Sequence, residues 1–139
     1  MNVHNVLVVD DDANTRNMLL AVLRQAGFAA DAAASGDEAL SRLETTDYSA
    51  VVLDVRMPGV SGIEVIRRMA STGRHHKCVV LMSAGTESLL DDAPSALVHT
   101  KLRKPFDIND VVEAVRGCVE SHGTGDAPFD NYPGKGRRK

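Results

Sequence analysis

The chain has 139 residues, of which 43% are hydrophobic, 25% charged and only 4% aromatic, a balance typical of one globular domain with an aliphatic core. Its hydrophobic runs are short and interrupted by charge, which excludes a membrane span, and the acidic start MNVHNVLVVDDD argues against a signal peptide. The formal net charge is −3, and acidic residues outnumber basic ones within residues 1–122, so we expect no direct nucleic acid binding.

Two cysteines, Cys78 and Cys118, lie far apart in the chain and share no CxxC spacing. We therefore expect neither a disulfide framework nor a zinc site, and we interpret both residues as small members of the core. This cysteine usage favours the reducing cytoplasm as the location of the protein.

Hydrophobic runs rich in Val and Leu alternate with helical patterns along most of the chain. In chain order we expect a strand at Asn5–Val9, a helix at Ala13–Ala26, a weaker strand at Phe28–Ala32, a helix at Gly36–Thr46, a strand at Ala50–Leu53, a helix at Val60–Ser71, a strand at Cys78–Met82, a short helix at Glu87–Ala93, a strand at Leu97–Leu102 and a helix at Asp107–Glu120.

This alternation predicts an α/β fold in which five strands form a parallel sheet covered by helices on both faces. We expect one domain over residues 1–122, followed by a flexible, basic tail rich in Gly and Pro over residues 123–139. In such sheets, ligands bind at the carboxyl ends of the strands, where the strand order reverses. Functional residues should therefore directly follow the hydrophobic runs.

Polar residues do follow four of the predicted strands; they are Asp10, Asp11, Asp12, Asp54, Ser83 and Lys104. Each has an ordinary structural interpretation, such as a helix cap at Asp12 or a surface lysine at Lys104. Their common position at one edge of one sheet predicts a functional site instead.

The residue types at this edge are suited to phosphoryl chemistry. Two carboxylates about 5 Å apart repel by roughly 3 kcal/mol at an effective dielectric constant near 20, so a proton or a cation must offset the repulsion. Oxygen ligands in an open, hydrated site favour Mg²⁺. A serine hydroxyl and a lysine ammonium could hold phosphoryl oxygens, and a carboxylate could accept the group covalently.

Four stretches of this sequence resemble the CheY-like receiver domain of two-component response regulators. They are VLVVDDD at 6–12, VVLDVRMPGVSG at 51–62, LMSAG at 81–85 and KPF at 104–106. The resemblance covers about residues 4–121. It implies a flavodoxin-like, doubly wound sheet with the strand order 2-1-3-4-5.

The resemblance also implies a role for each matching residue in phosphoryl transfer. Asp54 is the expected phosphoacceptor, while Ser83 and Lys104 are expected to hold the phosphoryl oxygens. Pro105 is expected to follow a cis peptide bond. Met57, Pro58 and Gly62 also match the loop that follows the acceptor, where glycine would supply a permissive backbone.

The expected cofactor is Mg²⁺, held by four of the matching residues. Its implied ligands are Asp10, Asp11, Asp54 and the backbone carbonyl of Arg56, whereas Asp12 is left out of the site.

As a receiver, the chain would be a signalling switch and not an enzyme, since its only chemistry would be its own phosphorylation and dephosphorylation. A sensor histidine kinase or a histidine phosphotransfer protein would donate the phosphoryl group to Asp54. The added charge would recruit Ser83 and Lys104 and change the binding of a downstream protein target in the cytoplasm.

Two alternatives stay open at this point. Lys101 stands where relatives usually carry an aromatic residue, which suits a degenerate receiver acting as a constitutive protein-interaction domain. An aspartate-nucleophile phosphohydrolase would also use Asp54, but it would need a second aspartate where this chain has Arg56. If the chain is a receiver, the long cationic side chain of Arg56 could shield the phosphoryl group and slow its hydrolysis.

Overall fold

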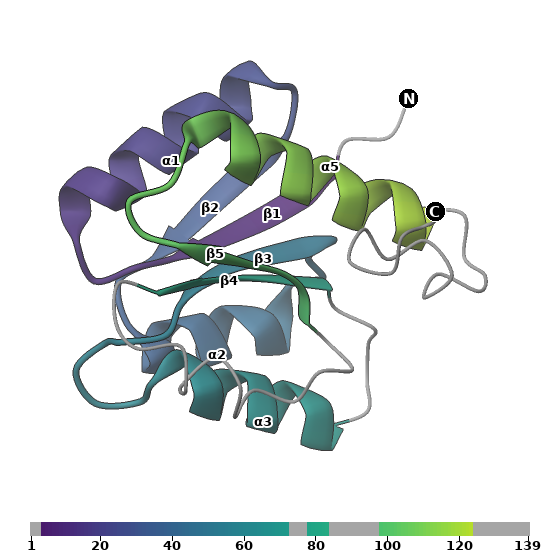
Figure 1. Ribbon diagram of the computed structural model, residues 1–139. Helices are drawn as coiled ribbons and strands as arrows, with labels where there is room; N and C mark the ends of the chain where they lie inside the picture. Colours follow the sequence, from purple (N-terminus) through teal and green to yellow (C-terminus); the bar gives the residue numbers. More distant parts are fainter. Residues whose placement is uncertain (1–3, 73–77, 84–97, 124–139) are drawn as a thin grey trace.

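The computed structural model describes residues 4–72, 78–83 and 98–123 of the chain (Figure 1). Its elements are β1 (Asn5–Val9), α1 (Ala13–Gln25), β2 (Ala29–Ala33), α2 (Gly36–Thr45), β3 (Ala50–Asp54), α3 (Gly62–Thr72), β4 (Cys78–Ser83), β5 (Val98–Arg103) and α5 (Ile108–Gly123). The short helix predicted at Glu87–Ala93 and the tail beyond Gly123 lie outside the described residues.

The five strands form one parallel sheet in the order β2-β1-β3-β4-β5, which confirms the predicted α/β fold and its topology. Helices α1 and α5 cover one face of this sheet, and α2 and α3 cover the other (Figure 1). Among the described helices, none combines the length and apolar character needed to cross a membrane.

The core consists of two layers because successive side chains of a strand point to opposite faces of the sheet. In β1, Leu7 and Val9 join the cluster under α2 and α3, whereas Val6 and Val8 join the cluster under α1 and α5. The central strands β3 and β4 are buried at every position, which explains their continuous hydrophobic runs. The outermost strand β2 has exposed positions, which explains its weaker sequence signal.

Side-chain caps define where the helices begin. The Thr15 amide donates a hydrogen bond to Asp12 Oδ2 at 2.9 Å, so Asp12 caps α1 as its ordinary interpretation predicted. The Glu64 amide donates to Ser61 Oγ at 3.2 Å, and α3 therefore begins at Gly62 and not at Val60.

The two cysteines correct the sequence-based expectation. Both are buried in the core, as predicted, but they are joined by a disulfide bond. Cys78 begins β4 and Cys118 lies in α5, and the packing of this helix on the sheet brings their Cα atoms to 5.6 Å. Spacing along the chain gave no sign of this contact because it depends on where α5 crosses β4.

Candidate functional site

The carboxyl ends of the strands meet at one edge of the sheet, where the chain turns to opposite sides after β1 and β3. Asp10 directly follows β1, Asp54 ends β3 and Ser83 ends β4. Because β3 and β4 are parallel and in register, Asp54 pairs with Met82, the residue before Ser83. The sheet thus brings residues from distant parts of the chain to the edge that the sequence predicted.

These residues are also the exceptions in an otherwise hydrophobic interior. Among the described residues, the buried polar side chains are Asp10, Asp54 and Ser83, with exposed fractions of 0%, 5% and 1%. Burying carboxylates is unfavourable unless they are paired or bind a cation. Their positions in the core therefore indicate a function and not a role in packing.

Three carboxylates form a compact group at this edge, which we call the acidic cluster (Asp10, Asp11 and Asp54). One carboxylate oxygen of each residue lies within 4.8 Å of the others. Asp10 and Asp54 are buried, whereas Asp11 is exposed, so the cluster opens to water on one side. Oxygen donors that leave room for water fit Mg²⁺, which keeps several water ligands in protein sites.

A lysine ammonium offsets part of this negative charge. Lys104 Nζ lies 2.9 Å from Asp10 Oδ2 and 3.5 Å from Asp54 Oδ2, and its side chain is 22% exposed. The Lys104 amide donates a hydrogen bond to the Ser83 carbonyl at 2.8 Å, which fixes the chain where it leaves β5. The peptide bond between Lys104 and Pro105 is cis, as the resemblance implied.

Burial and charge perturb the ionisation of this group. Burial, together with the charge of Asp10, raises the pKa of Asp54 to about 6, although Lys104 acts in the opposite direction. Burial alone would lower the pKa of Lys104, but its hydrogen bond to Asp10 and the nearby carboxylates outweigh this and raise it. A cation is therefore favoured beside Asp54 at neutral pH.

Asp10 is held in place by two contacts that the sequence did not reveal. Its Oδ1 atom accepts a hydrogen bond of 2.9 Å from the Asp12 amide. Its carbonyl oxygen accepts one of 2.9 Å from Arg16 Nη1. An arginine in the first turns of a helix is ordinary, so the sequence carried no signal for the positioning role of Arg16.

The loop between β3 and α3 packs tightly against the end of β3. The Gly62 amide donates to the Val55 carbonyl at 2.9 Å, and a Cβ atom on Gly62 would collide with the Asp54 carbonyl oxygen. Gly62 is thus needed for space and not for an unusual backbone angle, which corrects its expected role. The positive φ of 78° in this loop belongs to Gly59.

The remaining predicted residues lie at or near this edge. The backbone of Arg56 donates a hydrogen bond to Asp54 that lowers its pKa, while the Arg56 side chain is exposed. Lys101 is exposed on β5, three residues before Lys104. The role of the Arg56 carbonyl as a metal ligand and that of Ser83 as a phosphoryl partner stay predictions.

Comparison with known proteins decides the family. The model of the response regulator receiver domain family matches residues 6–116 of this chain. The chain belongs to this family. The receiver match spans all nine described elements except the ends of β1 and α5.

Curated relatives place this receiver among signalling proteins. Sporulation initiation phosphotransferase F of Bacillus subtilis is 29% identical over 111 residues, covering 80% of this chain and 90% of the relative. Transcriptional regulatory protein FixJ of Azorhizobium caulinodans is 33% identical, with coverages of 82% and 54%. Response regulator MprA of Mycolicibacterium vanbaalenii is 35% identical, with coverages of 82% and 49%. The chain thus spans about half the length of the latter two.

Solved structures agree with this assignment. A receiver protein of Pseudomonas putida has a TM-score of 0.78 at 29% identity, covering 84% of this chain and 98% of its own. Response regulator TrrA of Thermotoga maritima, solved in complex with Mg²⁺ and beryllium fluoride, has a TM-score of 0.75 at 30% identity, with coverages of 84% and 99%. A CheY-like receiver of Methanospirillum hungatei, at 17% identity and a TM-score of 0.83 over 90% and 100%, shows the same fold.

Proposed function

We propose that this receiver domain is a phosphoryl-accepting switch with Asp54 as the acceptor. The observation that carries the proposal is the acidic cluster, in which Lys104 Nζ lies between the carboxylates of Asp10 and Asp54. Carboxylates gathered beside one ammonium suit a site that must bind a divalent cation and a phosphoryl group together.

The donor would be a phosphohistidine of a sensor histidine kinase or of a histidine phosphotransfer protein. An Asp54 carboxylate oxygen attacks the phosphorus atom, the new O–P bond forms as the P–N bond breaks, and the histidine ring leaves with the electron pair of that bond. The only substrate is the chain's own side chain, so the domain is a switch and not an enzyme with turnover of a free substrate. We place this exchange in the cytoplasm.

Asp10, Asp11, Asp54 and the Arg56 carbonyl would hold Mg²⁺. The ion supplies positive charge that offsets the repulsion between the donor's phosphoryl group and the carboxylates. The name of the Bacillus relative, a phosphotransferase, and the complex of TrrA with Mg²⁺ and beryllium fluoride support this assignment.

Phosphorylation would redistribute the contacts of Lys104. The ammonium now contacts Asp10 and Asp54, and a phosphoryl group on Asp54 adds stronger acceptor oxygens beside it. Ser83, buried at the end of β4, would donate a hydrogen bond from its hydroxyl group to another phosphoryl oxygen. Movement of these residues would change β4 and β5 and alter the affinity for a downstream protein target.

The exposed position of Lys101 on β5 favours one second candidate, a constitutive interaction domain that binds its target without phosphorylation. The two candidates differ in one measurement, the affinity for the target before and after treatment with a phosphodonor. An unchanged affinity would select the constitutive domain.

The acceptor is tested by incubation with acetyl phosphate or phosphoramidate and Mg²⁺, followed by intact mass measurement. We expect the mass of one phosphoryl group on the wild type and none on Asp54→Asn. Asp47→Asn is the matched control, because Asp47 is exposed and precedes β3 at the opposite edge of the sheet. Labelling of Asp54→Asn at the wild-type level, or of the wild type after removal of Mg²⁺, would overturn the proposal.

A further inference from the structure

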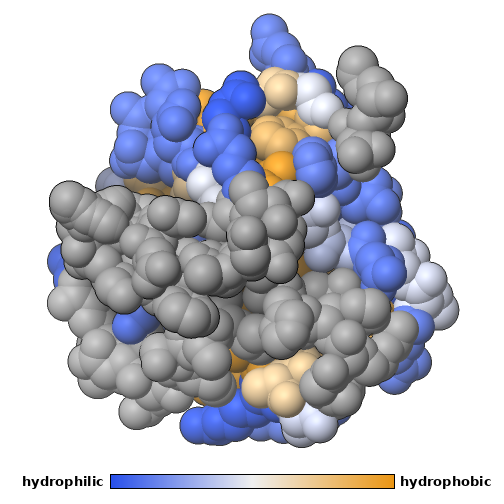
Figure 2. All heavy atoms as spheres, turned by 90° about the vertical axis from the view of Figure 1, so that its right-hand side faces the viewer, coloured by the Kyte–Doolittle hydropathy of each residue, from blue (hydrophilic) through white to orange (hydrophobic). Residues whose placement is uncertain are grey.

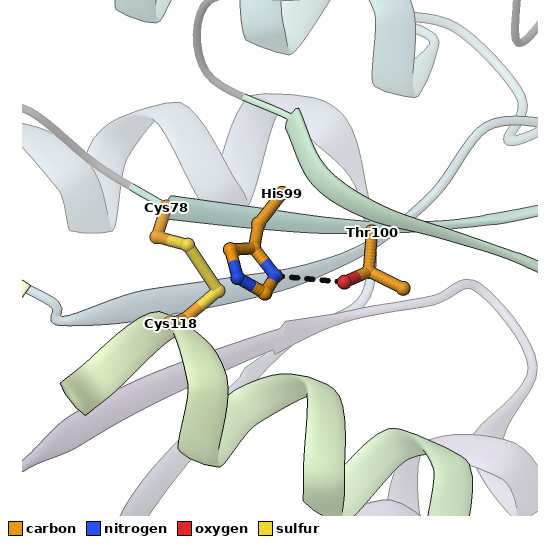
Figure 3. Close-up of a disulfide and its surroundings, with 4 residues drawn as sticks. All are labelled: Cys78, His99, Thr100 and Cys118. Carbon is orange, nitrogen blue, oxygen red and sulfur yellow. Dashed lines mark hydrogen bonds between the residues drawn. A yellow bond between two sulfur atoms is a disulfide. The ribbon is translucent and has the colours of Figure 1, made fainter. Parts of the chain in front are cut away.

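A second group of reactive side chains lies far from the acidic cluster, between β4, β5 and α5. We call it the sulfur cluster (Cys78, His99 and Cys118), and one sulfur or nitrogen atom of each residue lies within 4.8 Å of the others (Figure 3). Cys78 is the first residue of β4, whereas Ser83 is the last. The sulfur cluster is therefore separate from the proposed phosphorylation site.

The cysteines are shielded from solvent by the fold. Cys78 is 2% exposed and Cys118 is fully buried, within the core layer under α1 and α5. His99 is partly buried beside them on β5. The disulfide thus joins the start of a central strand to the helix that covers it, and reagents reach the sulfur atoms only when α5 opens locally.

The helix carries a space for the histidine ring. A Cβ atom on Gly117 would lie 2.9 Å from His99 Cε1 and 3.4 Å from Nε2. Glycine is unfavourable inside a helix, so its presence directly before Cys118 indicates that the ring needs this room. His99 Nδ1 lies 2.7 Å from Thr100 Oγ1, and Figure 3 shows the other ring nitrogen on the side that faces the sulfur atoms.

We propose that Cys78 and Cys118 form a reversible thiol–disulfide switch in which His99 is the acid–base group. A basic nitrogen within reach of two thiols can take the proton that must leave before a thiol becomes a nucleophile. The pair is a modification site of the receiver that responds to the redox state of its surroundings.

The chemistry requires an external disulfide, for which we name glutathione disulfide as the representative. One cysteine thiol loses its proton to His99, and its thiolate attacks the external disulfide, so that a mixed disulfide forms and one glutathione leaves. The leaving glutathione thiolate takes this proton from His99, which can then accept the proton of the second cysteine. The second thiolate attacks the bonded protein sulfur, closes the Cys78–Cys118 bond and releases the second glutathione, which leaves as a thiol with that proton. Two electrons pass from the cysteine pair to the external disulfide.

The ligand set favours this exchange over a structural zinc site. Structural zinc is held by four protein ligands, whereas the cluster found among the described residues offers three, and its two sulfur atoms are bonded to each other. Zinc binding by the reduced chain is therefore an outcome of the test that would contradict the proposal.

The consequence for the molecule is a change in how firmly α5 is held on the sheet. In the oxidised chain a covalent link fixes α5 to β4, while in the reduced chain only packing holds it. We expect slower amide hydrogen exchange in α5 of the oxidised chain. We also expect a Tm about 10 °C higher, as for a disulfide that closes a loop of this length.

The test equilibrates the purified chain in glutathione buffers of stepped redox ratio, traps thiols with N-ethylmaleimide and measures the intact mass. We expect two species that differ by two alkyl groups and interconvert in both directions. Cys78→Ser and Cys118→Ser should each remove the Tm difference between oxidising and reducing buffers. If either variant fails to fold, the wild type compared in the two buffers carries the same test.

The role of His99 is tested by the rate of disulfide closure. His99→Gln should close at least about tenfold more slowly without a change in the equilibrium ratio of the two species. Two free thiols under oxidising buffer, or one bound Zn²⁺ per reduced chain that prevents closure, would overturn the switch. A wild-type rate in His99→Gln would overturn the role of the histidine.

Discussion

The two ends of β4 lie in chemically different surroundings. Ser83 belongs to the edge that carries the acidic cluster, which is open to water and holds an unbalanced negative charge. Cys78 lies at the other end, covalently bonded beneath α5. Figure 2 views the molecule from the side at which the strands begin, and the described residues visible there are mostly hydrophilic, with smaller hydrophobic areas. An open, charged site can take up a ligand from solution, whereas a buried sulfur pair can act only through the packing around it.

The largest expected loss of stability comes from a substitution that disturbs the backbone packing beside the acidic cluster. Gly62→Ala should lower the free energy of unfolding by about 3 kcal/mol, because the new Cβ meets the Asp54 carbonyl oxygen and neither backbone can yield easily. Urea denaturation measures this. Gly59→Ala is the control, since a Cβ there meets no atom within 4 Å and strains only the positive φ, at about 1 kcal/mol. Equal losses in the two variants would contradict the close packing at Gly62.

The next largest loss of stability is expected when the ammonium group beside the acidic cluster is removed. Lys104→Met should lower the free energy of unfolding at pH 7.5 by about 2 kcal/mol, since it leaves Asp10 and Asp54 unpaired, and the 22% exposure of Lys104 moderates the loss. Added Mg²⁺ should restore more than half of the loss. Lys101→Met, on the exposed side of the same strand, should change stability by less than about 0.5 kcal/mol. A Lys104→Met variant as stable as Lys101→Met would show that the ammonium does not stabilise the cluster.

A smaller effect on stability depends on pH, and this dependence distinguishes the charge of Asp54 from its packing. The folded chain raises the pKa of Asp54 from 3.8 to about 6, so the ionised carboxylate destabilises the fold as pH rises through this window. Asp54→Asn should therefore be more stable than the wild type by about 1–2 kcal/mol at pH 8, with no gain from this source below pH 4. Chemical denaturation in the absence of Mg²⁺ at both pH values measures the difference. A gain that is the same at pH 4 and pH 8 would show that packing, not charge, causes it.

The two ends of β4 also differ in how far their contents could be predicted from the sequence. The acidic edge was foreseeable because parallel strands end together, so Asp10 and Asp54 had only to follow hydrophobic runs. The strands themselves were predicted within about one residue at each end. The signal was clearest for β1, β3 and β4, whose nearly continuous burial leaves a continuous hydrophobic run, and weaker for β2 and β5, which have exposed positions. The start of α3 was misplaced because Val60 is hydrophobic while the cap at Ser61 was overlooked.

The sulfur cluster was not foreseeable by the same reasoning. Its formation depends on the point at which α5 crosses β4, which neither strand burial nor helix periodicity determines. One signal was present in retrospect, the glycine inside a helical pattern at Gly117, directly before Cys118. An unfavourable helix residue beside a cysteine indicates close approach of another group, although the sequence could not name His99 as that group.

The central claim is tested most directly by locating the phosphoryl group. The chain is treated with acetyl phosphate and Mg²⁺, the acyl phosphate is reduced with borohydride, which converts a phosphorylated aspartate to homoserine, and the peptides are sequenced by mass spectrometry. We predict homoserine at position 54 and an unmodified aspartate at positions 10 and 11. Homoserine at either of those positions, or at none of the three, would contradict the account.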